Sequence, residues 1–233
     1  MRVKAGFTRV AFTPGDQVAA PVGIVVDVLR ATSTICQALA AGYESVTCVG
    51  EIDDARALAR LGFKLAGERH NVRIEGFDFG NSPRELVDPP DEPTRLVLTT
   101  TNGTRALLAA AARCETVLVA SLLNLGAVID EASRADDVAI LCAGVEGEFA
   151  LDDAYVAGRI AAALGGQPDD AAIAAIRLAA AFPTPEEGLA GGISADNIRR
   201  AGLDEDIPWC ARESVLGLVP RVVERAPASV VVA

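Results

Sequence analysis

The stretch GIVVDVLRATSTI, residues 23–35, contains the transition that decides the fold. Its first half is a run of apolar, mostly β-branched residues, which predicts a strand over 23–28 that is covered on both faces. Hydroxylated residues then begin a segment predicted to be helical over 34–41. A buried strand that passes directly into a helix is the repeating unit of α/β proteins with a parallel sheet.

The same alternation continues along the chain. Further strands are predicted at 2–10, 45–49, 95–100, 116–120 and 137–142. Helices are predicted between them, at 53–61, 104–112, 122–133 and 153–164. Beyond residue 165 the pattern becomes helical, including 169–182, and two strand-like runs, RVVE and SVVV, follow it. The sequence therefore predicts an α/β fold in which helices enclose a mainly parallel sheet, with a helix-rich C-terminal part packed closely on it.

Composition limits the classes of function. The 233 residues suffice for one large domain over 1–233, or for two lobes with a boundary near 165. A formal net charge of −11 gives no basic surface, so we expect no nucleic-acid partner. Five scattered cysteines without a CxxC pair indicate reduced thiols in a cytoplasmic protein. We also expect no signal peptide and no membrane span, because no apolar run approaches about 20 residues.

Polar residues at the end of the strand at 23–28 give a candidate site. Asp27 and Arg30 lie at the sheet edge where parallel sheets bind ligands. The first turn of a helix attracts anions, and an arginine fork suits phosphate or sulfonate oxygens. Asp27 could approach such an anion only with a cation between them, which suggests Mg²⁺. The structural alternative is that Thr32 or Ser33 caps the helix and Asp27 pairs with Arg30.

A second strand end carries a similar set of residues, in LVLTTTNGTRALLAAA, 96–111. Gly103 permits a positive φ, so successive amides from Thr101 to Thr104 could curl into an anion-binding nest. Arg105 would add a positive charge beside it. The alternative is an ordinary capped turn, because Asn102 and the threonines are common N-cap residues.

Two more segments bring acidic and polar groups. The run CAGVEGEFALDD, 142–153, leads from a strand to Asp152 and Asp153, which could equally be first-turn acids that complement a helix dipole. The segment 67–85 shows no sustained period, as is typical of a functional loop or of a solvated one. Its candidate side chains are Glu68, Arg69, Asp78, Asn81 and Ser82.

Several other chemistries lack support. No GxGxxG follows a strand and no GxxxxGK[ST] occurs, so neither a dinucleotide nor a P-loop site is predicted. His70 is the only histidine, which excludes a histidine-rich zinc site. Cys142 lies near the predicted site without a CxxxxxR phosphate loop, and we expect it to be a small buried residue. Residue patterns leave the roles of His70, Asp78, Cys142 and Asp152 open.

Long motifs in this chain resemble those of the 2-phosphosulfolactate phosphatase (ComB-like) family, which belongs to sulfolactate and coenzyme M biosynthesis. They are VVDVLRATSTI, GERHNVRIEGFDFGNSPRE, LTTTNGTRALL, CAGVEGEFALDDAYVAG and, more loosely, EDIPWCARESVLGLVP. The resemblance extends from about residue 22 to residue 220. It implies a Mg²⁺-dependent hydrolase that removes phosphate from a small anionic phosphoester, on a three-layer α/β/α fold. The family pattern has Glu-Asp where this chain has Asp152-Asp153, which favours Asp153 as the ligand.

The resemblance, taken with the residue patterns, gives a hypothesis for the site. Mg²⁺ is held by Asp27, Glu68 and Asp153, and Arg30 binds the phosphate. The residues expected to bind the substrate are Ser33, Thr34, Arg69, Asn81, Ser82, Thr101, Asn102, Gly103, Thr104 and Arg105. Arg69 and Arg105 are candidates for a sulfonate or carboxylate, and the late motif, which contains Glu213, receives no role.

Several alternatives stay open. Asp27 could attack phosphorus directly, but Leu29 replaces the second carboxylate of the haloacid-dehalogenase DxD pattern, which favours a water activated by the metal. The chain could act on another acidic phosphoester, be a haloacid-dehalogenase-like phosphotransferase, or be a non-catalytic anion-binding or regulatory protein. Its alanine-rich helix faces could form the contact of a homodimer or belong to the core.

Overall fold

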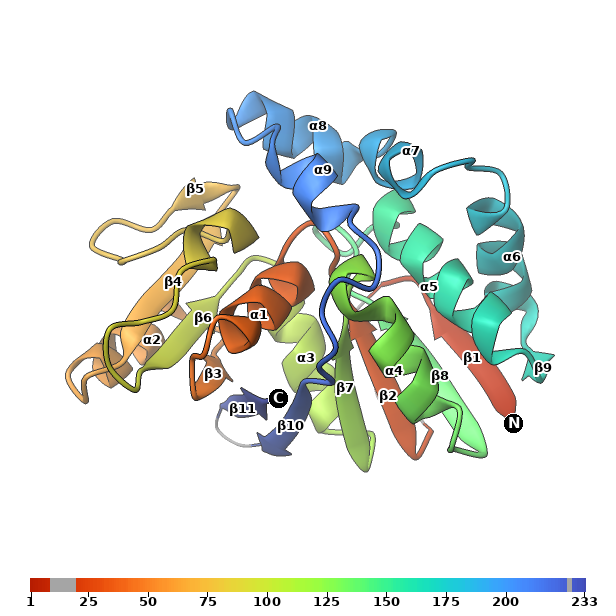
Figure 1. Ribbon diagram of the computed structural model, residues 1–233, viewed down its shortest axis with the longest axis horizontal. Helices are drawn as coiled ribbons and strands as arrows, with labels where there is room; N and C mark the ends of the chain where they lie inside the picture. Colours follow the sequence, from red (N-terminus) through yellow and green to blue (C-terminus); the bar gives the residue numbers. More distant parts are fainter. Residues whose placement is uncertain (9–19, 226–227) are drawn as a thin grey trace.

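A computed structural model describes residues 1–8, 20–225 and 228–233 of the chain. The strands in these ranges are β1 (Arg2–Gly6), β2 (Val22–Val26), β3 (Ser45–Cys48), β4 (Lys64–Arg69), β5 (Val72–Arg73), β6 (Arg95–Thr99), β7 (Thr116–Ala120), β8 (Asp137–Cys142), β9 (Gln167–Pro168), β10 (Arg221–Glu224) and β11 (Ser229–Val232). They form one sheet in the order β5-β4-β6-β3-β11-β10-β7-β2-β8-β1-β9. The sheet extends across the whole width of the molecule in Figure 1.

Two parallel groups of strands make up this sheet. In one group β6 pairs with β3 and β4, and in the other β2 pairs with β7 and β8. The hairpin of β10 and β11 lies between the groups and is antiparallel to both neighbours. The strand-like runs near the end of the sequence therefore join the two groups into one sheet. The sheet is mainly parallel, as the sequence predicted.

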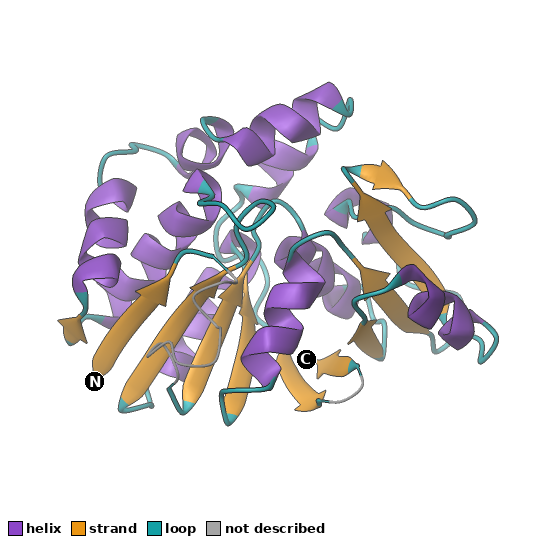
Figure 2. Ribbon diagram, turned by 180° about the vertical axis from the view of Figure 1, so that it is seen from behind, coloured by secondary structure: helices purple, strands orange, loops and turns teal. Residues whose placement is uncertain are grey.

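Helices cover both faces of the sheet. They are α1 (Ala31–Ala40), α2 (Ile52–Ala59), α3 (Gly103–Ala111), α4 (Leu125–Ala132), α5 (Leu151–Leu164) and α6 (Asp170–Ala179). Figures 1 and 2 place α1, α4, α5 and α6 on one face and α2 and α3 on the other. The three-layer α/β/α fold is thus confirmed.

The central strands are apolar on both sides because both sides are packed. On β2, Ile24 and Val26 belong to the core cluster beneath α4 and α5, whereas Val25 belongs to the cluster that contains the α3 residues. All three side chains are fully buried. Burial on both faces is what turns an alternating strand pattern into a continuous apolar run.

Most predicted elements agree with the structure to within two or three residues. The predicted strand at 2–10 ends at Gly6, and its last two residues lie outside the described ranges. The predicted helix at 122–133 begins with the 3₁₀ helix η3 (Leu122–Asn124), because Ser121 and Asn124 form a capping box there. The predicted helix at 169–182 ends earlier, at Ala179.

One prediction about the segment 67–85 is wrong. Its first residues belong to β4, whose sequence KLAGER pairs in parallel with β6. Gly67 and the charged end of this strand hid its period, because neither residue type is typical of strands. The remainder contains β5 and the 3₁₀ helix η2 (Pro83–Leu86), and Ile74 and Phe77 anchor it in a small core. Glu68 therefore lies on a strand end and not in a loop.

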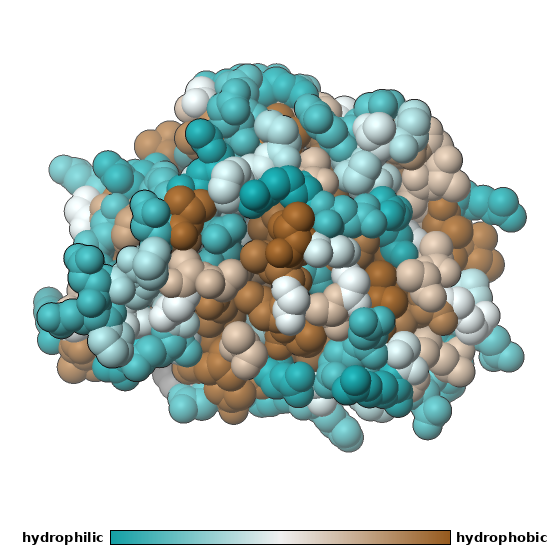
Figure 3. Space-filling model, viewed as in Figure 1, coloured by the Kyte–Doolittle hydropathy of each residue, from teal (hydrophilic) through white to brown (hydrophobic). Residues whose placement is uncertain are grey.

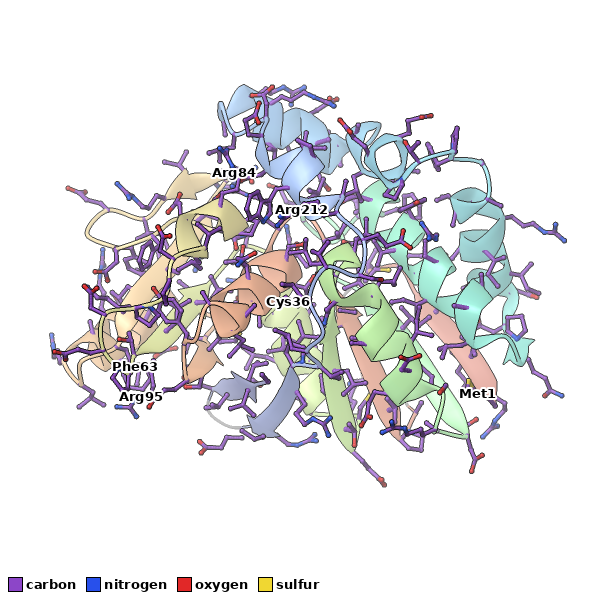
Figure 4. The ribbon with its side chains drawn as sticks, viewed as in Figure 1. Met1, Cys36, Phe63, Arg84, Arg95 and Arg212 are labelled. Atoms are coloured by element: carbon purple, nitrogen blue, oxygen red, sulfur yellow. The ribbon has the colours of Figure 1, made fainter. Side chains whose placement is uncertain are left out.

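Three short helices lie over the carboxyl ends of the central strands. They are α7 (Pro185–Ala190), α8 (Ile193–Arg200) and α9 (Asp206–Cys210), called the cap helices below. Figure 1 shows them, in blue, above the arrowheads of the sheet. α9 packs against η2, on which Figure 4 labels Arg84.

The face drawn in Figure 3 is mostly polar at its periphery, and hydrophobic side chains gather in its middle. Val215 and Val223 are among the large hydrophobic residues that stay exposed. The homodimer expected from the sequence stays a prediction. No helix in the described ranges is long and apolar enough to cross a lipid bilayer. At the outer end of the sheet the Arg95 guanidinium lies 4.1 Å from the Phe63 ring centroid (Figure 4).

The cysteines give a first test of this packing. All five are free and buried, and burial raises the pKa of Cys36, Cys48 and Cys210 to about 12. Because the thiolate is the reactive form, we predict that Ellman's reagent at pH 8 labels almost no thiol in the native chain and five in denaturant. Rapid labelling of two or more thiols in the native chain would contradict the packing described here.

Candidate active site

A cavity of about 360 Å³ opens between the carboxyl ends of the strands and the cap helices. Strand register explains why separate loops reach it. Val26 on β2 lies level with Ala120 and Cys142, so the chain leaves these three strands at one edge. The predicted residues that line the cavity are Asp27, Arg30, Glu68, Asn81, Thr101, Asn102, Asp152 and Asp153. The convergence predicted from the sequence therefore occurs.

Asp27 is held where β2 passes into α1. Its Oδ1 accepts a hydrogen bond of 3.2 Å from the backbone N–H of Ala31, so this carboxylate occupies the first turn of the helix. Thr32 and Ser33 are not the caps, and Arg30 pairs elsewhere, which corrects the structural alternative derived from the sequence.

The hydroxyl groups that follow Asp27 stabilise the turn. Thr32, Ser33 and Thr34 each donate to a backbone carbonyl, those of Asp27, Val28 and Asn81 respectively. Ser33 and Thr34 are fully buried and lie outside the cavity wall, so the structure does not bring these two predicted residues to the substrate position.

Gly103 serves a different purpose from the one predicted. It does not have a positive φ and begins α3, so the expected nest is not formed. A Cβ atom at this position would lie 2.4 Å from Asp27 Oδ2 and 2.4 Å from the Ala31 Cβ. Glycine is needed here because α3 starts in direct contact with Asp27. Thr104 is buried and exchanges hydrogen bonds with Thr100, which closes this turn.

Glu68 is brought to the cavity by the pairing of β4 with β6. Gly67 lies opposite Thr99, so Glu68 stands beside the turn that follows β6. One of its oxygens accepts from the Thr101 N–H at 2.9 Å, and the other accepts from the Asn71 N–H at 2.7 Å. Two backbone amides thus fix a carboxylate that is only 5% exposed.

Arg30 is fixed by the cap. Its Nη1 donates to Asp206 Oδ2 at 2.7 Å, and both side chains of this ion pair are almost completely buried. Asp206 also accepts a hydrogen bond of 2.6 Å from Ser82 Oγ, and the Asn71 side chain accepts from Arg30 Nη2. Asp206 belongs to the EDIPW run, to which sequence reasoning assigned no role.

Two adjacent acids on the first turn of α5 complete the cavity. Asp153 accepts from the N–H of Val28 and from the N–H of Gly144, both at 3.0 Å, and so ties the ends of β2 and β8 together. Asp152 accepts from Ser194 Oγ at 2.8 Å, on the cap helix α8. Both acids are buried, so they do more than complement a helix dipole from the surface.

These carboxylates perturb one another. Burial, with the charges of Asp152 and Glu68 nearby, raises the pKa of Asp27 to about 7. Burial also raises the pKa of Asp152 to about 6, and burial with the charges of Asp152 and Asp27 raises the pKa of Asp153 well above its usual value. The cationic side chains on the described wall are Arg30, which is already paired, and Arg200. The cavity therefore carries an excess of negative charge.

Other predicted residues lie away from the cavity. Arg69 donates to the carbonyls of Glu68 and Gly50, and Arg105 pairs with Glu51 at 3.2 Å. Ser82 does not line the cavity and donates to Asp206, the partner of Arg30. Asp78 binds Lys64 and the Leu65 N–H, and Cys142 is buried behind the wall. His70 lies at the rim, where its Nδ1 is 3.6 Å from Glu146 Oε1.

A divalent cation fits this site by its chemistry. No three carboxylate, imidazole or thiol groups in the described part of the chain are already gathered as a metal-binding group. Mg²⁺ does not require such a group, because it commonly binds through one or two carboxylates, waters and phosphate oxygens. Buried carboxylates with raised pKa values, in a cavity that must admit an anion, form a donor set suited to it.

Comparisons with known proteins identify relatives of this chain. Residues 8–225 match the family model described as 2-phosphosulpholactate phosphatase. A protein of Thermus thermophilus named "Probable 2-phosphosulfolactate phosphatase" is 40% identical over 219 residues, which cover 91% of this chain and 92% of the relative. A protein of the same name in Symbiobacterium thermophilum is 37% identical, and the match covers 91% of this chain and 95% of that relative. Another in Thermotoga petrophila is 35% identical, and the match covers 92% of this chain and 94% of that relative.

The chain belongs to the 2-phosphosulfolactate phosphatase family. This membership was expected from its motifs, and it places the chain among phosphoric monoester hydrolases.

The buried ion pair generates a prediction about stability. Asp206→Asn leaves the Arg30 charge buried with weaker compensation, so we expect the free energy of unfolding to fall by about 3–5 kcal/mol. Ser82→Ala removes a single hydrogen bond from the same carboxylate and should cost about 1–2 kcal/mol. Denaturant titration measures both values. Equal effects of the two substitutions would show that Asp206 does not stabilise the Arg30 charge.

The raised pKa values generate a prediction about pH. A carboxylate whose folded pKa exceeds its unfolded value makes the protein less stable as pH rises between those values, here between about 4 and 6 for Asp152. In chelator, Asp152→Asn should therefore be more stable than wild type at pH 8, by roughly 2 kcal/mol, and lose most of that advantage near pH 4.5. The exposed control Asp130→Asn should gain nothing. A destabilisation by Asp152→Asn of equal size at both pH values would contradict the raised pKa.

Proposed function

We propose that this chain is a Mg²⁺-dependent phosphatase that hydrolyses 2-phospho-3-sulfolactate, or a similar small acidic phosphoester, to sulfolactate and phosphate. The observation that carries the proposal is the meeting of Asp27, Glu68 and Asp153 with the buried Arg30 in one cavity. An arginine beside carboxylates is the combination expected where a phosphate and a cation bind together. The substrate class follows the names of the relatives.

The carboxylates of Asp27, Glu68 and Asp153 are those that would hold Mg²⁺, one or two of them directly and the remainder through water. When bound, the ion neutralises charge on the phosphoryl oxygens and so makes phosphorus accessible to a nucleophile. Their hydrogen bonds with the backbone keep these carboxylates in place before any ligand arrives. The preorganisation matters because fixed charges need not rearrange during the reaction.

Arg30 binds a phosphoryl oxygen in this proposal. Its Nε–H is buried and has no hydrogen-bond partner in the described chain, and the oxygen of the Asn81 side-chain amide is in the same condition. Both residues line the cavity. A buried donor without a partner is costly, so a ligand oxygen at Nε would supply a hydrogen bond that the protein alone leaves unmade.

Asp152 accepts the proton of the attacking water. One of its oxygens is held by Ser194, and a pKa of about 6 suits a base that works near neutral pH. Direct attack by Asp27, as in haloacid dehalogenases, would instead leave a phosphorylated chain in the reaction. Acid-quenched protein incubated with a labelled phosphoester distinguishes the two, because the water mechanism leaves no label on the chain.

The proposal predicts the effect of Asp27→Asn. Phosphate release from 2-phospho-3-sulfolactate should depend on Mg²⁺ in the wild type and fall at least about 100-fold in this variant. Its thermal stability should stay at or above that of the wild type, because a buried carboxylate with raised pKa is replaced by a neutral amide. Asp130→Asn, an exposed acid on α4, is the matched control and should retain activity.

The same assay tests the alternative of a non-catalytic anion-binding protein. Mg²⁺-dependent phosphate release from any small acidic phosphoester excludes it. A folded wild type that binds phosphate but releases none from 2-phospho-3-sulfolactate, phospholactate or phosphoglycolate would favour it and contradict the proposal.

A further inference from the structure

The cap helix α8 places one arginine at the cavity, and we propose that this residue, Arg200, recognises an anionic group of the phosphoester other than the phosphate, either a sulfonate or a carboxylate. The inference rests on the proposed function for the identity of the first anionic group, the phosphate. It adds a determinant of specificity on an element far in sequence from the strand ends that hold the phosphate.

The position of Arg200 separates it from the other arginine of the wall. Arg30 lies among the strand ends and is neutralised by Asp206 at 2.7 Å. Arg200 lies on the last turn of α8. This helix also contributes Ser194 and Asn197 to the cavity wall. A substrate whose phosphate lies at Arg30 could therefore present another anionic group to α8.

Arg200 retains an uncompensated charge. No carboxylate in the described ranges lies within ion-pair distance of it, and its Nη1 donates instead to the neutral Asn197 side chain at 3.2 Å. This hydrogen bond leaves other N–H donors of the guanidinium for a ligand, and an arginine fork matches the oxygens of a sulfonate or carboxylate.

The neighbouring Arg199 shows what a merely structural arginine does on the same turn. Its Nη1 pairs with Asp196 at 3.0 Å and its Nη2 donates to the Ala190 carbonyl, away from the cavity. Either arginine would complement the dipole at the end of α8, so that role cannot distinguish them. Only Arg200 is part of the described cavity wall.

The charge balance of the cavity favours a cationic residue at this position. Glu146 adds a further carboxylate to the wall, beside the acids already described. A sulfonate or carboxylate that enters this space is repelled unless a cation meets it. Arg69 and Arg105, which the sequence suggested for this purpose, are engaged with Gly50 and Glu51 outside the cavity. Arg200 is the cation in the described wall that remains for it.

Kinetics with a matched pair of phosphoesters test the inference. 2-Phospho-3-sulfolactate and 2-phosphoglycerol both carry phosphate on the central carbon, but only the first has further anionic groups. Arg200→Gln should raise KM for 2-phospho-3-sulfolactate about ten-fold and lower the ratio of the two kcat/KM values by a similar factor. Arg200→Lys should retain part of the selectivity, and Arg199→Gln should retain all of it. 2-Phospholactate, which keeps only the carboxylate, shows which group Arg200 binds.

Binding of sulfolactate, measured by calorimetry, separates this inference from the proposed function, because that ligand has no phosphate to release. Arg200→Gln should weaken it about ten-fold. If the wild type hydrolyses no phosphoester while Arg200→Gln still loses sulfolactate binding, the proposed function fails and the inference stands. The inference is overturned if Arg200→Gln lowers kcat/KM equally for both phosphoesters, so that selectivity is unchanged. It is also overturned if the wild type does not bind sulfolactate.

Discussion

The constraint on which this site depends is the mutual repulsion of several buried carboxylates at one edge of the sheet. Parallel strands end level with one another, so Asp27, Glu68 and Asp153 meet although they are far apart in sequence. Backbone amides hold each of these carboxylates, which keeps them in place despite their mutual repulsion. We propose that a phosphate enters such an edge together with a cation, because the carboxylates alone would repel it.

The cap solves a second problem, which is to bury an arginine among carboxylates in a fixed position. Arg30 comes from the turn between β2 and α1, and Asp206 comes from the late EDIPW run. Their ion pair joins these two segments. On α8, Ser194 donates a hydrogen bond to Asp152. The cap therefore contacts both the Arg30 guanidinium and one of the acids of the site. The helix-rich C-terminal part is therefore a component of the site and not only a support for the sheet.

The sequence predicts the parts of this site that obey short-range rules. Buried strands that pass into helices identified the sheet, and they placed Asp27, Arg30 and Asp153 at the edge where the cavity lies. Glu68 was found with the wrong local structure, because Gly67 and charged residues obscure a strand that only its pairing with β6 defines. Contacts across the fold were not predictable. Gly103 is needed for close packing on Asp27, and only the packing of the cap brings Asp206 to Arg30 and Arg200 to the cavity. For the same reason, Arg69 and Arg105 look like ligands in the sequence although Gly50 and Glu51 hold them elsewhere.

The central claim is that this acidic cavity takes an oxyanion and a divalent cation together. Calorimetric titration of inorganic phosphate into the metal-free chain, with and without saturating Mg²⁺, tests it most directly. The account predicts that each ligand tightens the binding of the other by the same factor, on the order of ten-fold or more. Phosphate that binds equally well in chelator would contradict it.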